Sequence, residues 1–146
     1  MRFWFIVGLA LDFRSVMALA FSTTLRNARL DAITTTVGAN CQIMIYDGAR
    51  PATGGAATTL LAQLAGNATF AGAASAGVLT LNAITQDASA NATGTASWFR
   101  INTNGGTFCI DGSIGTSGSD LNLNTTSIVS GGPVSITSFT ITEANS

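Results

Sequence analysis

Between Ser22 and Val37 the apolar positions recur every three to four residues, the spacing of one face of an α-helix. These positions are Leu25, Ala28 or Arg29, Ala32 or Ile33, and Val37. Ser22 has a side chain suited to cap the helix, and Gly38 follows where a helix commonly ends. We therefore predict one short N-terminal helix over about 22–37, with a last turn weakened by three consecutive threonines.

The charged residues near this helix are predicted to lie in solvent. Arg26, Arg29 and Asp31 fall outside the apolar positions and indicate a solvated helix face. Glu143, close to the C-terminus, is interpreted as a solvated tail charge.

After Gly38 the hydrophobic period changes from helical spacing to the alternation of a β-strand. Cys41, Ile43 and Ile45 share one face of a predicted strand that ends at the turn Asp47-Gly48, before a loop over 49–58. Further strands are predicted over 59–64, 68–74, 78–84, 92–102, 107–111 and 134–142.

Two features sharpen the strand pattern. Residues 102–106 carry an Asn-Gly signal and predict a hairpin turn. The alternation changes parity between Ile136 and Phe139, which predicts a β-bulge at Thr137-Ser138. Trp98 and Phe99 put bulk on both faces of their strand, so this strand is either covered on both sides or located at a subunit contact.

Short strands separated by Gly- and Asn-rich turns are typical of sandwiches and barrels. The chain of 146 residues is 47% hydrophobic and 9% charged, a balance that excludes intrinsic disorder and suits a single domain. We predict a mainly β fold, a β-sandwich or jelly-roll-like domain with one short N-terminal α-helix, over residues 17–146.

Residues 1–16 are predicted to lie outside this domain. Residues 3–11 form an apolar run that is too short to span a membrane as a helix, which needs about 20 residues. The favoured interpretation is an upstream extension before a true start at Met17. The alternatives are a signal peptide cleaved after Ala18-Leu19-Ala20, which Asp12 and Arg14 argue against, and a genuine N-terminal segment.

The composition removes several kinds of chemistry. The chain has no histidine, and all 6 of its basic residues are arginines. A P-loop, a histidine-activated nucleophile and a histidine zinc site are therefore excluded. A net charge of −1 without basic clusters also argues against nucleic-acid binding. We therefore expect that the protein is not an enzyme and that it has no catalytic residue, no metal ligand and no cofactor.

The acidic residues and the motif over 115–118 do not predict a catalytic site. Asp47, Asp87, Asp111 and Asp120 would supply a glycosidase pair only if folding brought two of them to within about 5–10 Å. Asp111-Gly112 and Asp120 do not match a calcium loop and are interpreted as turns. Residues 115–118 are one residue short of a nucleophile elbow and are also interpreted as a turn.

The two cysteines are predicted to remain unpaired. Cys41 shares the apolar face of its strand, whereas Cys109 lies on the less apolar face of another. A disulfide needs both sulfur atoms on matching sides and within reach, so free thiols, as in a reducing cytoplasm, are favoured.

Three stretches carry a resemblance to a known family: 98–101, 111–128 and 133–140, together with the opening Met17-Ala18-Leu19-Ala20-Phe21-Ser22. The chain resembles the head decoration, or cement, proteins of tailed double-stranded DNA bacteriophages from Met17 to its end. These motifs are turn and strand sequences without a chemical signature. Residues 1–16 lie outside the resemblance.

The resemblance implies a structural virion protein, made in the host cytoplasm, that binds the outer surface of the phage head and bridges shell subunits. It implies the major capsid protein as partner and self-association, with a homotrimer favoured over a dimer, and neither nucleic acid nor membrane as partner. A tail or tail-fibre component and an exported carbohydrate-binding module are the alternatives.

Four residues are the candidate interface. Leu19 and Phe21 are apolar residues before the helix, and they form either an arm toward the shell or a hydrophobic staple on the helix. Trp98 and Phe99 are the bulky pair of the two-sided strand. For Trp98 a core position is favoured over a sugar-stacking one.

Overall fold

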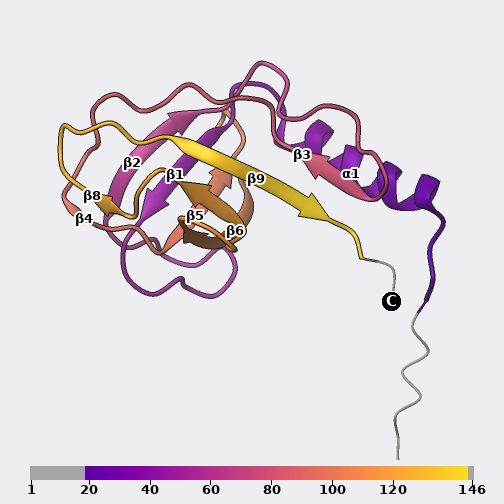
Figure 1. Ribbon diagram of the computed structural model, residues 1–146, viewed down its shortest axis with the longest axis horizontal. Coiled ribbons are helices and arrows are strands. Elements are labelled where there is room, and N and C mark those ends of the chain that lie inside the picture. Colours follow the sequence, from indigo (N-terminus) through magenta and orange to yellow (C-terminus); the bar gives the residue numbers. More distant parts are fainter. Residues whose placement is uncertain (1–18, 145–146) are drawn as a thin grey trace, which may run out of the picture.

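The computed structural model describes residues 19–144, in which one helix is followed by nine strands (Figure 1). The expectations for a Met17 start and for residues 1–16 therefore concern residues outside the described ones. Helix α1 covers Thr23–Val37. The strands are β1 (Gln42–Tyr46), β2 (Leu60–Ala65), β3 (Val78–Thr80), β4 (Gly94–Thr95), β5 (Trp98–Asn102), β6 (Phe108–Gly115), β7 (Leu121–Leu123), β8 (Ser127–Ile128) and β9 (Ile136–Thr142).

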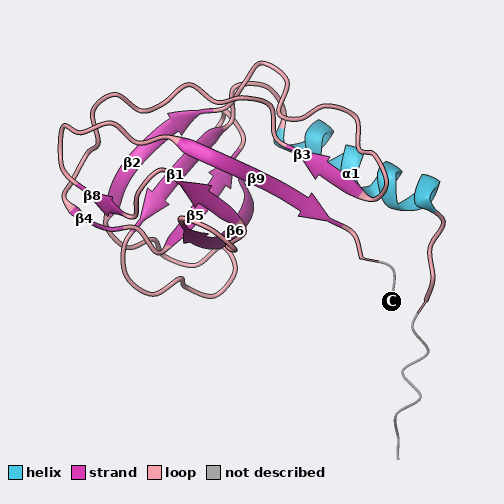
Figure 2. Cartoon of the chain, in the orientation of Figure 1, coloured by secondary structure: helices cyan, strands magenta, loops and turns pink. Residues whose placement is uncertain are grey.

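Seven strands form one curled sheet in the order β2-β1-β5-β6-β7-β9-β3, and β4 pairs with β8 in a second, small sheet (Figure 2). Neighbours in the large sheet are antiparallel except β6 and β7, which run parallel. The predicted mainly β, sandwich-like domain with one N-terminal helix is confirmed.

Strands β1 and β5 are buried on both faces. Ile43 and Ile45 face the main hydrophobic core. On the opposite face Met44, Tyr46 and Trp98 form a second buried cluster, in which the Tyr46 and Trp98 rings stack with centroids 4.4 Å apart. The expectation that the Trp98 strand is covered on both sides is thus confirmed.

Helix α1 begins and ends as predicted, but its buried face is different. The Ser22 hydroxyl accepts a hydrogen bond from the Leu25 N–H, and Gly38 ends the helix with a positive φ of 74°. The buried residues are Leu30 and Val37, whereas Leu25 is 46% exposed. The predicted apolar face was therefore wrong at Leu25, because polar contacts fix the rotation of the helix.

One of these polar contacts is made by Asp31, which the sequence assigned to solvent, and another by Asn27. The Asp31 carboxylate accepts a hydrogen bond from the Ala74 N–H at 2.7 Å, and the Asn27 side chain accepts one from the Gly77 N–H at 2.8 Å. Both donors lie in the loop before β3, beside which α1 packs (Figure 1). The prediction of a solvated face was wrong for Asp31, because the carboxylate serves this loop.

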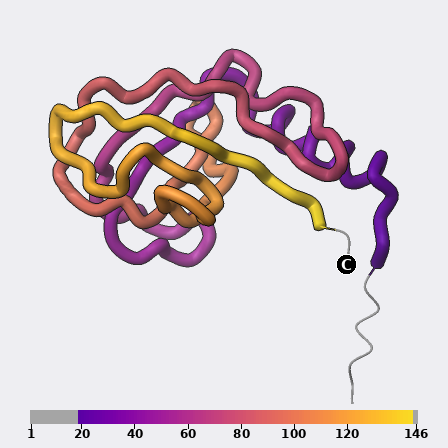
Figure 3. The backbone as a smooth tube through the Cα atoms, viewed as in Figure 1, coloured from indigo at the N-terminus to yellow at the C-terminus, as the bar shows by residue number. Residues whose placement is uncertain are grey.

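The end of β9 is held by the same helix. The Arg26 guanidinium donates to the Glu143 carbonyl at 2.8 Å, and Arg29 pairs with the Glu143 carboxylate at 3.0 Å. Glu143 is therefore an anchor and not a solvated tail charge. Figure 3 shows that the two described ends of the chain lie on the same side of the molecule.

The predicted strands were partly wrong in extent. Residues 68–74 form no strand and contribute one isolated bridge, Ala71 with Leu81, because Phe70 is the only large side chain that this segment buries. Residues 92–102 divide into β4 and β5, because the Ala96 N–H bonds to Thr126 while the Ser97 N–H bonds to Tyr46. The short strands β7 and β8 were not predicted.

The hairpin and the bulge are confirmed. The Thr103 N–H donates to the Thr107 carbonyl, and Gly106 has a φ of 86°. Between β7 and β9, Ser138 opposes Asn122 while Ile136 opposes Leu123, so Thr137 is the extra residue of the bulge.

Candidate functional site

The structure separates the four candidate interface residues into two pairs. Leu19 is 70% exposed, and Phe21 lies beside it, half-buried. Trp98 and Phe99 are each 1% exposed, so neither side chain is available to a partner in this chain. The core interpretation of Trp98 is confirmed.

Phe21 contacts the helix, although not as a hydrophobic staple. A staple pairs the residue before the N-cap with an apolar residue at the fourth helical position, and that position is Arg26. The Phe21 ring instead lies against the Arg29 guanidinium, with 5.2 Å between the ring centroid and the guanidinium carbon Cζ. This contact holds the segment before α1 and leaves Leu19 projecting.

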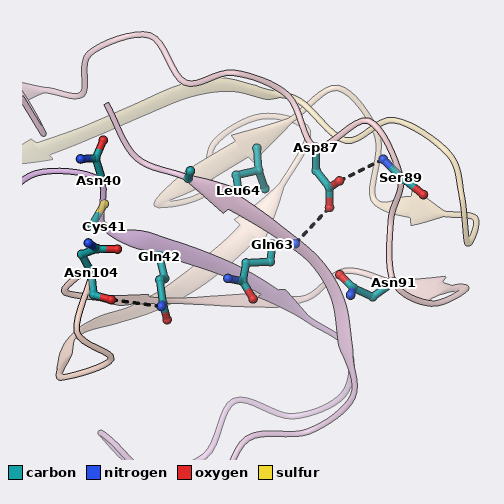
Figure 4. Close-up of a pocket in the computed structure, with 10 residues that line it drawn as sticks. Asn40, Cys41, Gln42, Gln63, Leu64, Asp87, Ser89, Asn91 and Asn104 are labelled. Atoms are coloured by element: carbon teal, nitrogen blue, oxygen red, sulfur yellow. Dashed lines mark hydrogen bonds between the residues drawn. The ribbon is translucent and has the colours of Figure 1, made fainter. Parts of the chain in front are cut away.

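A polar depression of about 410 Å³ lies where β1, β2 and the 103–107 hairpin meet (Figure 4). Its lining is rich in amide side chains and includes one carboxylate: Asn40, Gln42, Gln63, Asp87, Ser89, Asn91 and Asn104. Amides both donate and accept hydrogen bonds, which suits a neutral polar ligand or protein surface. None of the lining residues is aromatic, so a sugar would have no ring to stack on.

Asp87 is the one charged group of this depression, and its hydrogen bonds are structural. Its carboxylate accepts from the Gln63 N–H at 3.1 Å and the Ser89 N–H at 2.9 Å, as Figure 4 shows. Sequence reasoning missed this surface because Asn40, Asn91 and Asn104 lie in turns, where asparagine is common for conformational reasons alone.

A nearly buried ion pair lies on the second face of the sheet. The Arg100 and Asp111 side chains are 11% and 6% exposed and form two parallel hydrogen bonds of 2.8 and 2.9 Å. The loop before β2 completes the cluster, because Asp111 accepts the Gly54 N–H and Arg100 donates to the Gly55 carbonyl. The contacts with Gly54 and Gly55 attach the loop before β2 to the ion pair.

Electrostatics agree with this structural role. Burial raises the pKa of Asp111, but the hydrogen bonds from Arg100 and Gly54 outweigh it and leave the pKa below its usual value. For Asp120, hydrogen bonds from the Ser113 N–H and hydroxyl lower the pKa.

The turn interpretations are partly confirmed. Asp111 and Gly112 lie inside β6 and not in a turn, because the strand continues to Gly115. The segment after Gly115 is a turn as expected, with Gly118 at a φ of 68°.

The cysteines are free thiols, with Cys41 buried and Cys109 half-buried. Burial, and after it the nearby Cys109, raises the pKa of Cys41 to about 11. Its thiol therefore stays protonated at neutral pH. Within residues 19–144, no group of three or more potential metal ligands comes together.

No helix in the described part of the chain combines the length and apolar character needed to cross a membrane. Comparisons with known proteins identify no relative: no family model, curated protein or solved structure matches the chain significantly.

Proposed function

We propose that this chain is a phage head decoration protein, which binds the outside of the capsid and stabilises it by bridging shell subunits. The proposal rests on the sequence resemblance from Met17 onward. The structural observation that carries it is the exposed Leu19, 70% accessible and held beside α1 by the Phe21–Arg29 contact. An exposed apolar side chain next to a stable domain gains free energy when a pocket of the shell removes it from water.

The rest of the described surface suits packing among neutral protein surfaces. Of the described arginines, Arg26, Arg29 and Arg100 make hydrogen bonds or ion pairs within the chain, and Arg50 is exposed. The amide-lined depression offers hydrogen bonds without net basic charge. We propose the major capsid protein and further copies of this chain, as a homotrimer, as the partners.

The mechanism is additive. A decoration protein that sits across subunit boundaries buries area on each subunit, and rupture of the shell must break those contacts. Apolar burial stabilises by about 25 cal/mol per Å², less the cost of association. A modest contact repeated over many sites then raises the stability of the whole particle.

Co-sedimentation with undecorated phage shells tests the anchor. We expect Leu19→Asp to lower shell binding by about tenfold or more, the loss expected from a central apolar contact. Val129→Asp is the matched control, because Val129 is also apolar and 62% exposed but lies near β8, away from α1. Equal binding of both variants and the unchanged chain would contradict the anchor.

The same preparations distinguish the alternative functions. Binding to purified tails but not to shells would indicate a tail or tail-fibre component. Binding to a glycan array but to neither particle would indicate a carbohydrate-binding module.

A further inference from the structure

Three dipeptides of the chain place a glycine directly after Asn or Asp: Asp47-Gly48, Asn104-Gly105 and Asp111-Gly112. In such a pair the backbone nitrogen of the glycine can attack the side-chain carbonyl carbon, because glycine has no Cβ to obstruct the approach. The product is a cyclic succinimide. The reaction requires a side chain that is free to turn and a glycine N–H that no acceptor holds, so the surroundings of each pair decide which of them reacts.

The structure holds both Asp-Gly pairs in place. The Asp47 carboxylate accepts a hydrogen bond from the Thr59 N–H at 3.1 Å. The Asp111 carboxylate binds Arg100 through two hydrogen bonds, and Gly112 is buried within β6, where it pairs with β5. An ionised carboxylate is also a poorer target for a nucleophile than a neutral amide. Neither Asp-Gly pair therefore meets the requirements for ring closure.

The Asn-Gly pair lies at the exposed tip of the hairpin between β5 and β6. The Gly106 N–H donates to the Thr103 carbonyl at 2.9 Å, and neither Asn104 nor Gly105 has a positive φ, which is the pattern of a type I turn. The hydrogen bond of such a turn does not use the Gly105 N–H. Among residues 19–144, neither this N–H nor the Asn104 side-chain amide has a hydrogen-bond partner.

We propose that Asn104 is a site of spontaneous deamidation. The Gly105 nitrogen gives its proton to solvent and forms a bond to Asn104 Cγ, while the bond from Cγ to Nδ2 breaks and Nδ2 leaves as ammonia with a proton from solvent. Water then opens the succinimide. Opening at the Cγ carbonyl gives aspartate, and opening at the former main-chain carbonyl gives isoaspartate. The net reaction consumes water and releases ammonia, without an oxidant or a reductant.

The reaction changes the charge of the amide-lined depression, because Asn104 and Asp87 both line it (Figure 4). Asp87 is its only carboxylate before deamidation, and a second carboxylate at position 104 joins it afterwards. In the isoaspartate product, the Asn104 main-chain carbonyl that accepts from Gln42 Nε2 at 3.3 Å becomes part of a free carboxylate. The depression thus becomes more acidic as the protein ages. The proposal does not depend on the decoration function.

Mass spectrometry of the full chain, digested with trypsin after incubation in mildly alkaline buffer, measures the reaction at each asparagine. Asn91 is the internal control, because it is exposed and lines the same depression. Ala92 follows it, however, and the Ala92 N–H donates to the Leu61 carbonyl. We expect Asn104 to be converted about tenfold or more faster than Asn91, with both aspartate and isoaspartate as products.

Gly105→Ala is the matched variant. A Cβ at Gly105 would meet only Thr103 Oγ1, at 3.8 Å, and Gly105 has no positive φ, so the turn accepts alanine. The added methyl group obstructs the attacking nitrogen, and we expect conversion of Asn104 to slow by about tenfold or more. An unchanged melting temperature shows that the variant keeps the fold.

Two results would overturn the proposal. One is conversion of Asn104 at the same rate in the unchanged chain and in Gly105→Ala, or at the same rate as Asn91. The other is isoaspartate at Asp47 or Asp111 in the folded chain to the same extent as at Asn104, because the surroundings would then not select the site.

Discussion

Two regions of the molecule are stabilised in different ways. Around β1 and β5 the sheet is closed on both faces by large apolar side chains, with Trp98 and Phe99 each 1% exposed. Around α1 and the end of β9, hydrogen bonds and an ion pair of polar side chains add to the packing of Leu30 and Val37 in the core. The first region is closed by apolar packing on both faces of the sheet, whereas the second combines apolar packing with polar contacts near the surface.

The difference indicates where new contacts can form without loss of the fold. Apolar packing is cooperative, so changes near Trp98 should lower the stability of the whole domain. The hydrogen bonds of α1 join it to one loop and one strand end. Their loss should therefore increase local opening of that loop and strand end more than it lowers the stability of the whole domain. The proposed anchor, Leu19, lies in the second region, shortly before α1.

The largest expected effect is that of Trp98→Ala. It removes the ring stacked on Tyr46 and the indole N–H that donates to the Asp47 carbonyl at 2.9 Å. We expect a loss of about 3–5 kcal/mol in the free energy of unfolding, measured by urea denaturation. Leu19→Ala is the control and should change it by less than about 0.5 kcal/mol. A loss below about 1 kcal/mol for Trp98→Ala would contradict the closed-core description.

Asp111→Asn should have the next largest effect, because it removes the charge partner of the nearly buried Arg100. We expect a loss of about 2–3 kcal/mol at neutral pH. The folded-state pKa of Asp111 is lowered, so its stabilisation is present above the unfolded value near about 4 and is lost as pH falls through the folded value. The difference between the unchanged chain and the variant should therefore shrink below about pH 4. A difference that stays constant down to about pH 2 would contradict this ion pair.

Gly112→Ala tests the packing where the two regions meet. A Cβ at Gly112 would lie 2.4 Å from Cε1 of the Phe99 ring. We expect a loss of about 1–3 kcal/mol, since the core ring must move. Gly72→Ala is the matched control, because a Cβ there would meet nothing within 4 Å. Thermal unfolding compares the two variants. Equal melting temperatures would contradict this expectation, because they would mean that the Phe99 ring moves aside without loss of stability.

Asp31→Ala should have the smallest effect on global stability, about 1 kcal/mol, because it removes one hydrogen bond to the loop before β3. The Ala74 amide should exchange faster, while the Ile43 and Ile45 amides change little. Leu25→Ala, on the exposed side of the same helix, should leave Ala74 unchanged. Equal acceleration at Ala74 and Ile45 would mean that the two regions unfold together.

Local features of the fold were predictable from the sequence. The Ser22 cap, the Gly38 end of the helix and the Thr137 bulge each depend on residues close together in the chain. The two-sided burial of Trp98 followed from consecutive bulky residues in one strand. In each case the signal and the structure occupy the same few residues.

Features that depend on distant partners were not predictable. The helix rotation follows from Arg26 meeting Glu143, residues far apart in the chain. Strands β7 and β8 are too short to show an alternation. The sheet order places the three-residue β7 between two longer strands, β6 and β9. Of the candidate interface residues, the sequence alone did not separate Leu19, which is exposed, from Phe99, which is buried.

Quantitative mass spectrometry of purified phage particles that carry this gene tests the proposed function most directly. It compares the copy number of this chain with that of the major capsid protein, and the N-terminal peptide identifies the first residue. A decoration protein is expected at a copy number near that of the major capsid protein. A handful of copies per particle, or none, would contradict the decoration role.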